Sequence, residues 1–195
     1  MRYNIHPTAF LDPRAIVDDP RSITVDAGAI VGPFATLERG VYVGPGSVIG
    51  GSGCGYLYDE DAGWVHKEHE FRVVLAEGVH VHSNVCVDRG SWRDTYIGAG
   101  TVIDNLVHIA HNVVTGRHCM IIAGAEVSGS CNLADQVYIG PNACVRERLS
   151  VGRRTIVGMG AVVVKDVDPG TVVAGVPAKY FGPVTEWPPP PPEGR

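Results

Sequence analysis

The chain has 195 residues and a net charge of −5, and its length suits one domain with a sizeable core. The acidic balance excludes a general nucleic-acid binder, because it offers no basic field to phosphates. No apolar run approaches the roughly 18 residues of a transmembrane helix, so we expect no membrane span. The opening residues carry no signal-peptide core, and the five cysteines form no CxxC pair. Both features favour a cytoplasmic protein.

The 25 glycines are spread along the chain, which favours a repeat architecture. Every sixth residue from position 97 to position 163 is Ile, Leu or Val, except Thr115. The residue four positions after each of these is in most repeats small or β-branched. The same register runs through positions 25–49, resumes at 75–87, and opens at positions 5–17 two residues out of phase.

A six-residue period fits neither the 3.6-residue helix nor a simple hairpin ladder. It fits a coil of three short parallel strands joined by tight turns, with the large aliphatic residues inside and glycines at turns that need a positive φ. Each coil then buries its apolar face against its neighbours. We therefore predict an all-β fold, a left-handed parallel β-helix built from hexapeptide repeats.

Two segments break the period. Residues 51–72 form a long insertion rich in aromatic and charged residues, and segment 88–96 lengthens one hexapeptide by four residues. Long excursions from a rigid scaffold commonly carry function. We expect one β-helix domain over residues 1–187, with a C-terminal cap at 168–187. The proline-rich tail at 188–195 is expected to be extended and solvated.

Several motifs follow one another through the middle of the chain. They are Gly-Cys-Gly-Tyr at 53–56, Trp-Val at 64–65, Val-Asp-Arg-Gly at 87–90, Asp-Thr-Tyr-Ile-Gly at 94–98, Ile-Asp-Asn at 103–105 and Ile-Ala-His-Asn-Val-Val at 109–114. In this order and spacing they resemble the UDP-3-O-acylglucosamine N-acyltransferases of lipid A synthesis, over roughly residues 40–165. The resemblance implies an acyltransferase that assembles as a homotrimer with its active sites between neighbouring coils.

Two departures separate the chain from that family. The lipid A enzymes carry a separate N-terminal uridine-binding domain, for which we expect no counterpart here. They also have a second active-site histidine, and Arg148 stands at that place. The ending Ala-Gly-Val-Pro-Ala-Lys at 174–179 is instead similar to the broader class of hexapeptide acetyltransferases that use acetyl-CoA.

Acyl transfer from a thioester needs a base that takes a proton from the attacking amine or hydroxyl, and an imidazole suits that role. The resemblance places this base at His111, at an outward corner of its coil. Gly129 lies one coil later, where its backbone N–H could hold an oxyanion, or the turn alone could require the glycine. Asp104 matches the family motif and is expected to orient the imidazole or the acceptor, unless it is an ordinary turn residue.

The expected substrate-binding residues come from the same motifs and from the insertion. Asn112 is expected to bind an amide of the donor or to cap a turn, and Trp64 and Tyr56 to stack on a base or sugar or to contact a neighbouring subunit. The predicted substrate-binding set is Asn105, Asn112, Trp64, Tyr56, Asp88 and Arg89.

We expect the donor to be acetyl-CoA or another acyl-CoA, with hydroxyacyl carrier protein as the alternative. Basic residues gather in the C-terminal rungs of this acidic chain, where they could bind phosphates or simply lie solvated at corners. The predicted cofactor-binding set is Arg148, Arg153, Arg154, Lys165, Gly175 and Lys179.

The predicted function is transfer of an acyl group, acetyl or short-chain, to an amine on a sugar or nucleotide-linked sugar. A gamma-type carbonic anhydrase or a non-catalytic assembly protein would also be compatible with a β-helix. A homotrimer is also expected because apolar residues such as Val79, Val102 and Ile122 fall outside the interior set. We expect no metal, because the spacing of histidines around His111 differs from that of the zinc enzymes. Cys119 and Cys131 are expected to be inert core residues.

Overall fold

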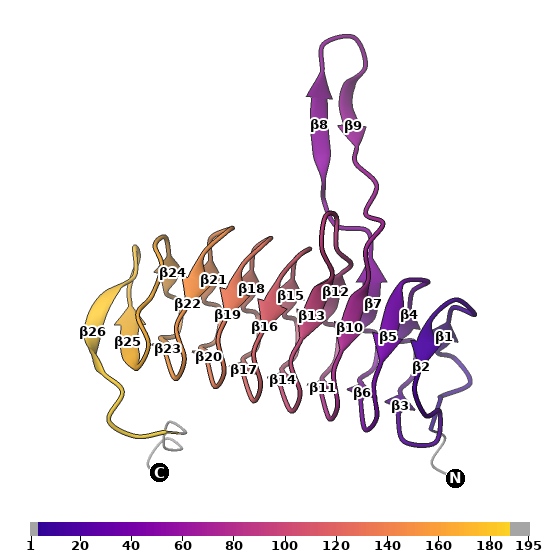
Figure 1. Cartoon of the computed structure of the whole chain (residues 1–195), viewed down its shortest axis with the longest axis horizontal. Coiled ribbons are helices and arrows are strands. Elements are labelled where there is room, and N and C mark those ends of the chain that lie inside the picture. Colours follow the sequence, from indigo (N-terminus) through magenta and orange to yellow (C-terminus); the bar gives the residue numbers. More distant parts are fainter. Residues whose placement is uncertain (1–3, 188–195) are drawn as a thin grey trace.

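Strands stacked into a row of coils form the body of the protein (Figure 1). The computed structural model describes residues 4–187, and the predicted tail at 188–195 lies outside them. Within the described part there is no helix, and three parallel sheets run the length of the row. This confirms the predicted left-handed parallel β-helix.

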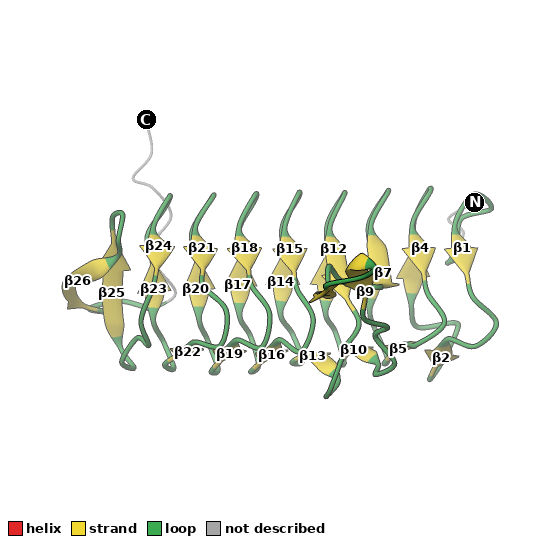
Figure 2. Ribbon diagram, turned by 90° about the horizontal axis from the view of Figure 1, so that it is seen from above, coloured by secondary structure: helices red, strands yellow, loops and turns green. Residues whose placement is uncertain are grey.

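Each coil adds one strand to each sheet, in the order first, second, third, and then rises to the next coil (Figure 2). The first sheet consists of β1 (Phe10–Leu11), β4 (Ile30–Val31), β7 (Val48–Gly51), β12 (Cys86–Asp88), β15 (His108–Ile109), β18 (Glu126–Val127), β21 (Cys144–Val145) and β24 (Val162–Val163). The second sheet consists of β2 (Ile16–Val17), β5 (Ala35–Leu37), β10 (Val73–Leu75), β13 (Thr95–Ile97), β16 (Val114–Thr115), β19 (Asn132–Leu133) and β22 (Ser150–Val151).

The third sheet runs from the first coil to the C-terminal cap. Its parallel strands are β3 (Thr24–Val25), β6 (Tyr42–Val43), β11 (His80–Val81), β14 (Val102–Ile103), β17 (Met120–Ile121), β20 (Tyr138–Ile139), β23 (Ile156–Val157) and β25 (Thr171–Ala174). The chain then turns back as β26 (Lys179–Pro183), which pairs antiparallel with β25 and covers the edge of the sheet. β25 is thereby paired on both sides, and β26 becomes the terminal strand of the sheet.

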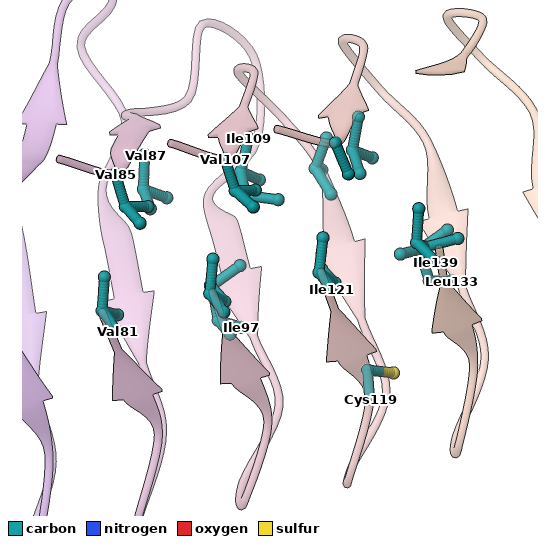
Figure 3. Packing of buried hydrophobic residues seen from close by; sticks show 14 of the residues in the cluster. Val81, Val85, Val87, Ile97, Val107, Ile109, Cys119, Ile121, Leu133 and Ile139 are labelled. Carbon is teal, nitrogen blue, oxygen red and sulfur yellow. The ribbon is translucent and has the colours of Figure 1, made fainter. Parts of the chain in front are cut away.

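The core is a stack of aliphatic side chains along the axis of the coils (Figure 3). Ile97, Ile109 and Ile121 are each 0% exposed, and Ile109 pairs with Val127 one coil later. Burying one such side chain contributes about 1.5–3 kcal/mol, and every coil repeats the gain. The six-residue pattern therefore marks the core correctly throughout positions 97–163.

One residue expected to face outward lies inside. Val79 is fully buried, because it stands four positions after Leu75 and so occupies the small interior position of its hexapeptide. Val102 and Ile122 are half-buried at the outer surface. Val102 and Ile122 are therefore apolar residues of the outer faces, as predicted, and Val79 is not.

Three corners join the sheets, and both breaks in the period fall at the same one. We call the turn between the first and second sheets the first corner; in regular coils it comprises residues 110–113, 128–131 and 146–149. The insertion leaves the body here after β7 and returns at β10. Of the lengthened segment, residues 89–94 lie between β12 and β13. The coils themselves thus bring the two irregular segments together.

Most of the insertion is a hairpin that projects from the body, and we call it the arm (Figure 1). It consists of β8 (Tyr56–Asp59) paired antiparallel with β9 (Gly63–His66). The Asp59 carboxylate accepts the backbone N–H groups of Asp61 and Ala62 at 3.0 and 2.8 Å and so fixes the turn. The sequence pattern marked the insertion but did not predict these strands.

Candidate active site

A pocket of about 260 Å³ opens at the first corner, beside the base of the arm. Three neighbouring coils, the insertion and the lengthened segment all contribute to its wall. Its lining residues are Gly55, Lys67, His69, Ser91, Trp92, His111, Asn112, Gly129, Ser130, Glu147 and Arg148. Of the predicted site residues, the structure therefore brings His111, Gly129, Asn112 and Arg148 to one place.

His111 and Gly129 stack one coil apart, as predicted. The N–H of Ser130 donates to the carbonyl of His111 at 2.9 Å, which sets the register of the two turns. A Cβ on Gly129 would stand 2.9 Å from Cε1 of His111, so the imidazole lies directly against the glycine backbone. Only a residue without a side chain leaves this ring in place.

The His111 ring is suited to accept a proton. Within residues 4–187 neither of its nitrogens has a hydrogen-bond partner. Burial lowers the pKa of His111, Asp88 opposes that shift, and the Lys67 ammonium adds to it. The imidazole is consequently neutral at neutral pH, which is the state that a general base requires.

A second histidine, His69, lies beside the first and was not predicted. Its ring centroid is 4.9 Å from that of His111, and only 1% of the residue is exposed. His69 belongs to the insertion. Arg89 on the lengthened segment holds this part of the insertion in place by donating its Nε–H to the carbonyl oxygen of His69. Trp92 also lines the pocket without having been singled out from the sequence.

Asp88 belongs to a charged cluster at the edge of this site. Nε2 of His108 is hydrogen-bonded to Asp88 Oδ2 at 3.0 Å, and Nδ1 is hydrogen-bonded to the Glu126 carboxylate at 2.9 Å. Hydrogen bonds to Asp88 and then to Glu126 raise the pKa of His108 to about 10, so the ring is a cation with both nitrogens donating. Asp88, predicted to bind substrate, is thus already paired with a cation.

Asn112 holds the lengthened segment against the coil. It is 1% exposed, and its Oδ1 accepts the backbone N–H groups of Ser91 and Trp92 at 2.8 and 3.2 Å. Its Nδ2 donates to the hydroxyl of Ser91 at 3.0 Å. The side-chain amide is therefore engaged in shaping the wall of the pocket, which matches the expected role in capping a turn rather than the role in binding the donor.

The predicted aromatic contacts lie on the arm. Trp64 and Tyr56 are 70% and 50% exposed, and Trp64 packs edge-on against Tyr58 with centroids 5.3 Å apart. The ring of Tyr56 contacts His66, which in turn lies 6.1 Å from His69. A row of rings thus leads from the arm down to the pocket.

Asp104 and Asn105 lie at a different corner, between the third and first sheets. The Asp104 carboxylate accepts from the backbone N–H groups of Asn105 at 2.7 Å and Ala123 at 3.2 Å, and Asn105 Oδ1 accepts from the N–H of Ser83. They follow a strand of the third sheet, whereas His111 follows one of the first. Within one chain they cannot orient His111, so any such contact would have to come from a neighbouring subunit.

The predicted cofactor-binding residues are dispersed. Only Arg148 lines the pocket, while Arg153 and Arg154 share Gln136 Oε1 at the corner between the second and third sheets, each at 3.0 Å. Lys165 lines a separate cleft at the C-terminal end, and Gly175 and Lys179 lie in the cap. Within residues 4–187 of one chain, these side chains form no continuous basic track from the rungs to His111.

Cys119 and Cys131 lie outside the pocket. Burial raises the pKa of Cys119 to about 11 and also raises that of Cys131, in line with their prediction as inert core residues.

Over residues 4–187, no three His, Cys, Asp or Glu side chains are grouped so as to hold a metal ion. The described residues likewise include no helix long and apolar enough to cross a membrane.

Sequence comparison relates the chain to proteins named as acyltransferases. The chain is 40% identical over 161 residues to the UDP-3-O-acylglucosamine N-acyltransferase of Methylorubrum extorquens, covering 83% of this chain and 44% of that enzyme. It is also 40% identical over 159 residues to the enzyme of the same name from a Caulobacter species, covering 82% and 45% of the two chains. The chain spans less than half the length of these relatives. No family model matches it.

Solved structures share the fold. A UDP-N-acetylglucosamine acyltransferase from Bacteroides fragilis superposes with a TM-score of 0.79 at 21% identity, covering 92% of this chain and 74% of that one. The Acinetobacter baumannii LpxA structure gives 0.70 at 22%, covering 93% and 74%. At this identity the likeness concerns the β-helix alone. The sequence matches carry the relationship itself: over its β-helix the chain is related to the UDP-3-O-acylglucosamine N-acyltransferases, as its motifs predicted.

Proposed function

We propose that this chain is an acyltransferase that moves an acyl group from a thioester to the amine of a sugar or nucleotide-linked sugar. The observation that supports it most directly is the imidazole of His111, which lies against the Gly129 backbone in a pocket and has no hydrogen-bond partner among the described residues. The names of the related enzymes supply the type of acceptor. A cytoplasmic location, expected from the sequence, belongs to the same proposal.

In this mechanism His111 takes a proton from the attacking amine as nitrogen bonds to the thioester carbonyl carbon. The negative charge that forms on the carbonyl oxygen is held by the N–H of Gly129. When the intermediate collapses, the carbon–sulfur bond breaks and the thiolate takes the proton from His111. Of the protein's own groups, only the imidazole needs to change its protonation state, since the proton passes from the amine to the leaving thiolate.

The direct test compares two histidines at turn positions. His111→Asn should lower kcat by about 10²–10⁴, because the variant removes the base and keeps a polar side chain. His118→Asn is the matched control, since His118 is an exposed turn residue at another corner. Equal activity of His111→Asn and the wild type would exclude this mechanism and favour a non-catalytic assembly protein.

Two acyl donors fit the proposal. The kinship with lipid A enzymes supports hydroxyacyl carrier protein at least as well as the acetyl-CoA predicted from the C-terminal motif. Arg148 and Arg154 allow a matched comparison, because both have a positive φ (63° and 55°), which asparagine tolerates. Arg148→Asn should weaken the binding of a donor that enters the pocket. Arg154→Asn should weaken the binding of a donor that lies along the corner between the second and third sheets. Each donor is assayed separately.

We also propose that the active protein is a homotrimer. The pocket lies at an outward corner of the coils, and Asp104, Asn105, Arg153 and Arg154 lie at other corners that only a second subunit could bring near it. Light scattering should give three times the chain mass. If a monomer transfers acyl groups, Asp104 and the other corner residues have no part in the reaction and the proposed trimer is not required.

A further inference from the structure

The buried imidazole of His69 has one nitrogen with a partner and one without. Its Nδ1 accepts the backbone N–H of Gly53 at 2.9 Å. Its Nε2 is fully buried and has no hydrogen-bond partner in the described part of the chain. Buried polar atoms in folded proteins are nearly always paired, so an unpaired one needs an explanation.

The bond from Gly53 fixes the protonation of the ring. Because Nδ1 accepts a hydrogen bond, a neutral His69 must carry its proton on Nε2. Burial and the neighbouring His111 both lower the pKa of His69, which keeps the ring neutral. The unpaired atom is therefore a hydrogen-bond donor, and it requires an acceptor such as an oxygen.

Two glycines keep the edge of this ring free of side chains. A Cβ on Gly55 would stand 2.6 Å from Nε2, and a Cβ on Gly53 would stand 2.7 Å from Cε1. Gly55 and His69 both line the pocket, and the His69 ring packs against that of His111. The Nε2–H donor of His69 thus belongs to a ring that lines the pocket and lies next to His111, with the two ring centroids 4.9 Å apart.

We propose that His69 contacts the substrate, and that its Nε2–H donates a hydrogen bond to a ligand oxygen bound beside His111. A thioester carbonyl oxygen and a sugar hydroxyl oxygen offer the same acceptor chemistry, and the experiment separates them. The chemical identity of the ligand rests on the proposed function. The buried, unpaired donor does not.

Nitrogen-15 NMR of the full chain measures the protonation and the chemical shift of His69 Nε2 directly. The free protein should show His69 protonated on Nε2 and unprotonated on Nδ1. Acetyl-CoA, acyl carrier protein bearing a hydroxyacyl group, and UDP-glucosamine are then titrated separately. A shift of Nε2 with a thioester assigns the carbonyl, and a shift with UDP-glucosamine assigns the sugar. If no probe moves Nε2, the atom serves an ordered water or nothing, and the proposal fails.

Three variants give the kinetic test. His69→Phe keeps a ring but removes both the Nε2–H donor and the acceptor for the Gly53 N–H. It should lower kcat/KM at least 10-fold, and the stranded Gly53 N–H should also lower the melting temperature. His69→Gln carries both an acceptor for Gly53 and a donor for the ligand, and should recover most of that loss. His80→Phe is the control, since His80 also packs on a second histidine, His82, at 4.8 Å, outside the pocket.

The outcomes separate this inference from the proposed function. A wild type that transfers no acyl group would defeat the proposed function, while the NMR titrations would still test the donor. An active wild type whose His69→Phe variant matches it in kcat/KM would overturn the inference and leave the function standing. Equal losses in His69→Phe and His69→Gln would also overturn it, because that result indicates packing rather than hydrogen bonding.

Discussion

The backbone of Gly129 lies in contact with the imidazole of His111, and only the absence of a side chain allows it. A methyl group there would come within 2.9 Å of Cε1 and 3.1 Å of Nε2. The φ of Gly129 is not in the left-handed region, so the backbone itself would accept alanine. The space beside the histidine is therefore the reason for glycine at this turn.

Gly129→Ala should accordingly displace His111 and leave the coil intact. We expect kcat/KM to fall at least about 100-fold, a loss comparable to that of an oxyanion donor, with a melting temperature close to that of the wild type. Gly182→Ala is the control, since nothing lies within 4 Å of the added methyl in the cap. A fully active Gly129→Ala would show that the contact has no part in catalysis.

Two charges near His111 should move its titration in opposite directions. Lys67 lowers the pKa of His111 and Asp88 raises it, although burial is the largest influence. Lys67→Gln should therefore move the titration of His111 to higher pH, and Asp88→Asn should move it to lower pH. Because the base must be neutral, the acidic limb of the rate profile should follow the same shifts.

Carbon-13 NMR of the His111 ring, with no substrate present, measures these shifts directly. Arg117→Gln, at the corner between the second and third sheets, serves as the control for a loss of positive charge remote from the pocket. Shifts of the same sign in Lys67→Gln and Asp88→Asn would contradict the electrostatic account of the site.

The pairing of His108 with Asp88 and Glu126 should make stability depend on pH. The pKa of His108 is raised to about 10, so its charge stabilises the fold fully below the ordinary value near 6.5. That contribution is then lost as the pH rises from 6.5 through about 10. Because 40% of the side chain is exposed, solvent screens the pair and about 1 kcal/mol is expected.

Urea unfolding of the wild type and of His108→Gln between pH 6 and 10 tests this. The difference between the two free energies of unfolding cancels the titration of groups that both proteins share. It should be largest at pH 6 and shrink steadily towards pH 10. A difference that stays constant over that range would mean that the histidine acts through packing alone.

The coils could be predicted from the sequence because one rule governs every residue of the repeat. Positions six apart share the interior, so the pattern from Ile97 to Val163 places each aliphatic correctly. The same rule explains the one misplaced residue, since Val79 occupies the small interior position rather than the outer face. The periodic pattern predicts whether a side chain points into the core or outward, and it does not predict the side chain's contacts.

The phase of the repeat also contained a signal for the site. Ile49 precedes the insertion and Ile109 precedes His111, and both belong to the first sheet. If each irregular segment is counted as one step, the interior positions run from 49 through 75, 81, 87, 97 and 103 to 109, which is two full coils. This count places the insertion and His111 at the same corner. The same count places Asp104 after the third sheet, away from His111.

The path of the insertion itself could not be predicted. Its residues follow no period, and the burial of His69 depends on contacts with Gly53 and Arg89 that arise only when the loop folds back. The exposed aromatics of the arm and the buried histidine lie within one stretch of similar composition. Tertiary contacts, which no local pattern encodes, distinguish them.

Asn112 offers the sharpest test of how the pocket wall is held. Its Oδ1 accepts the N–H groups of Ser91 and Trp92, and its φ of 61° is one that alanine adopts at a cost. Asn142 is a matched control, with a φ of 54° at another corner and an exposed side chain. Both alanine variants strain the backbone, and only Asn112→Ala also leaves the segment's N–H groups without a partner.

We therefore expect Asn142→Ala to lower the free energy of unfolding by about 1 kcal/mol, and Asn112→Ala by about 2 kcal/mol more, the cost of stranding buried donors. Urea unfolding measures both. Limited proteolysis should in addition cut Asn112→Ala within residues 89–94 under conditions that leave Asn142→Ala intact. Equal losses of stability in the two variants would show that the segment keeps its place without Asn112, and that the wall of the pocket is held by Arg93, which donates to the Asn112 carbonyl at 2.9 Å.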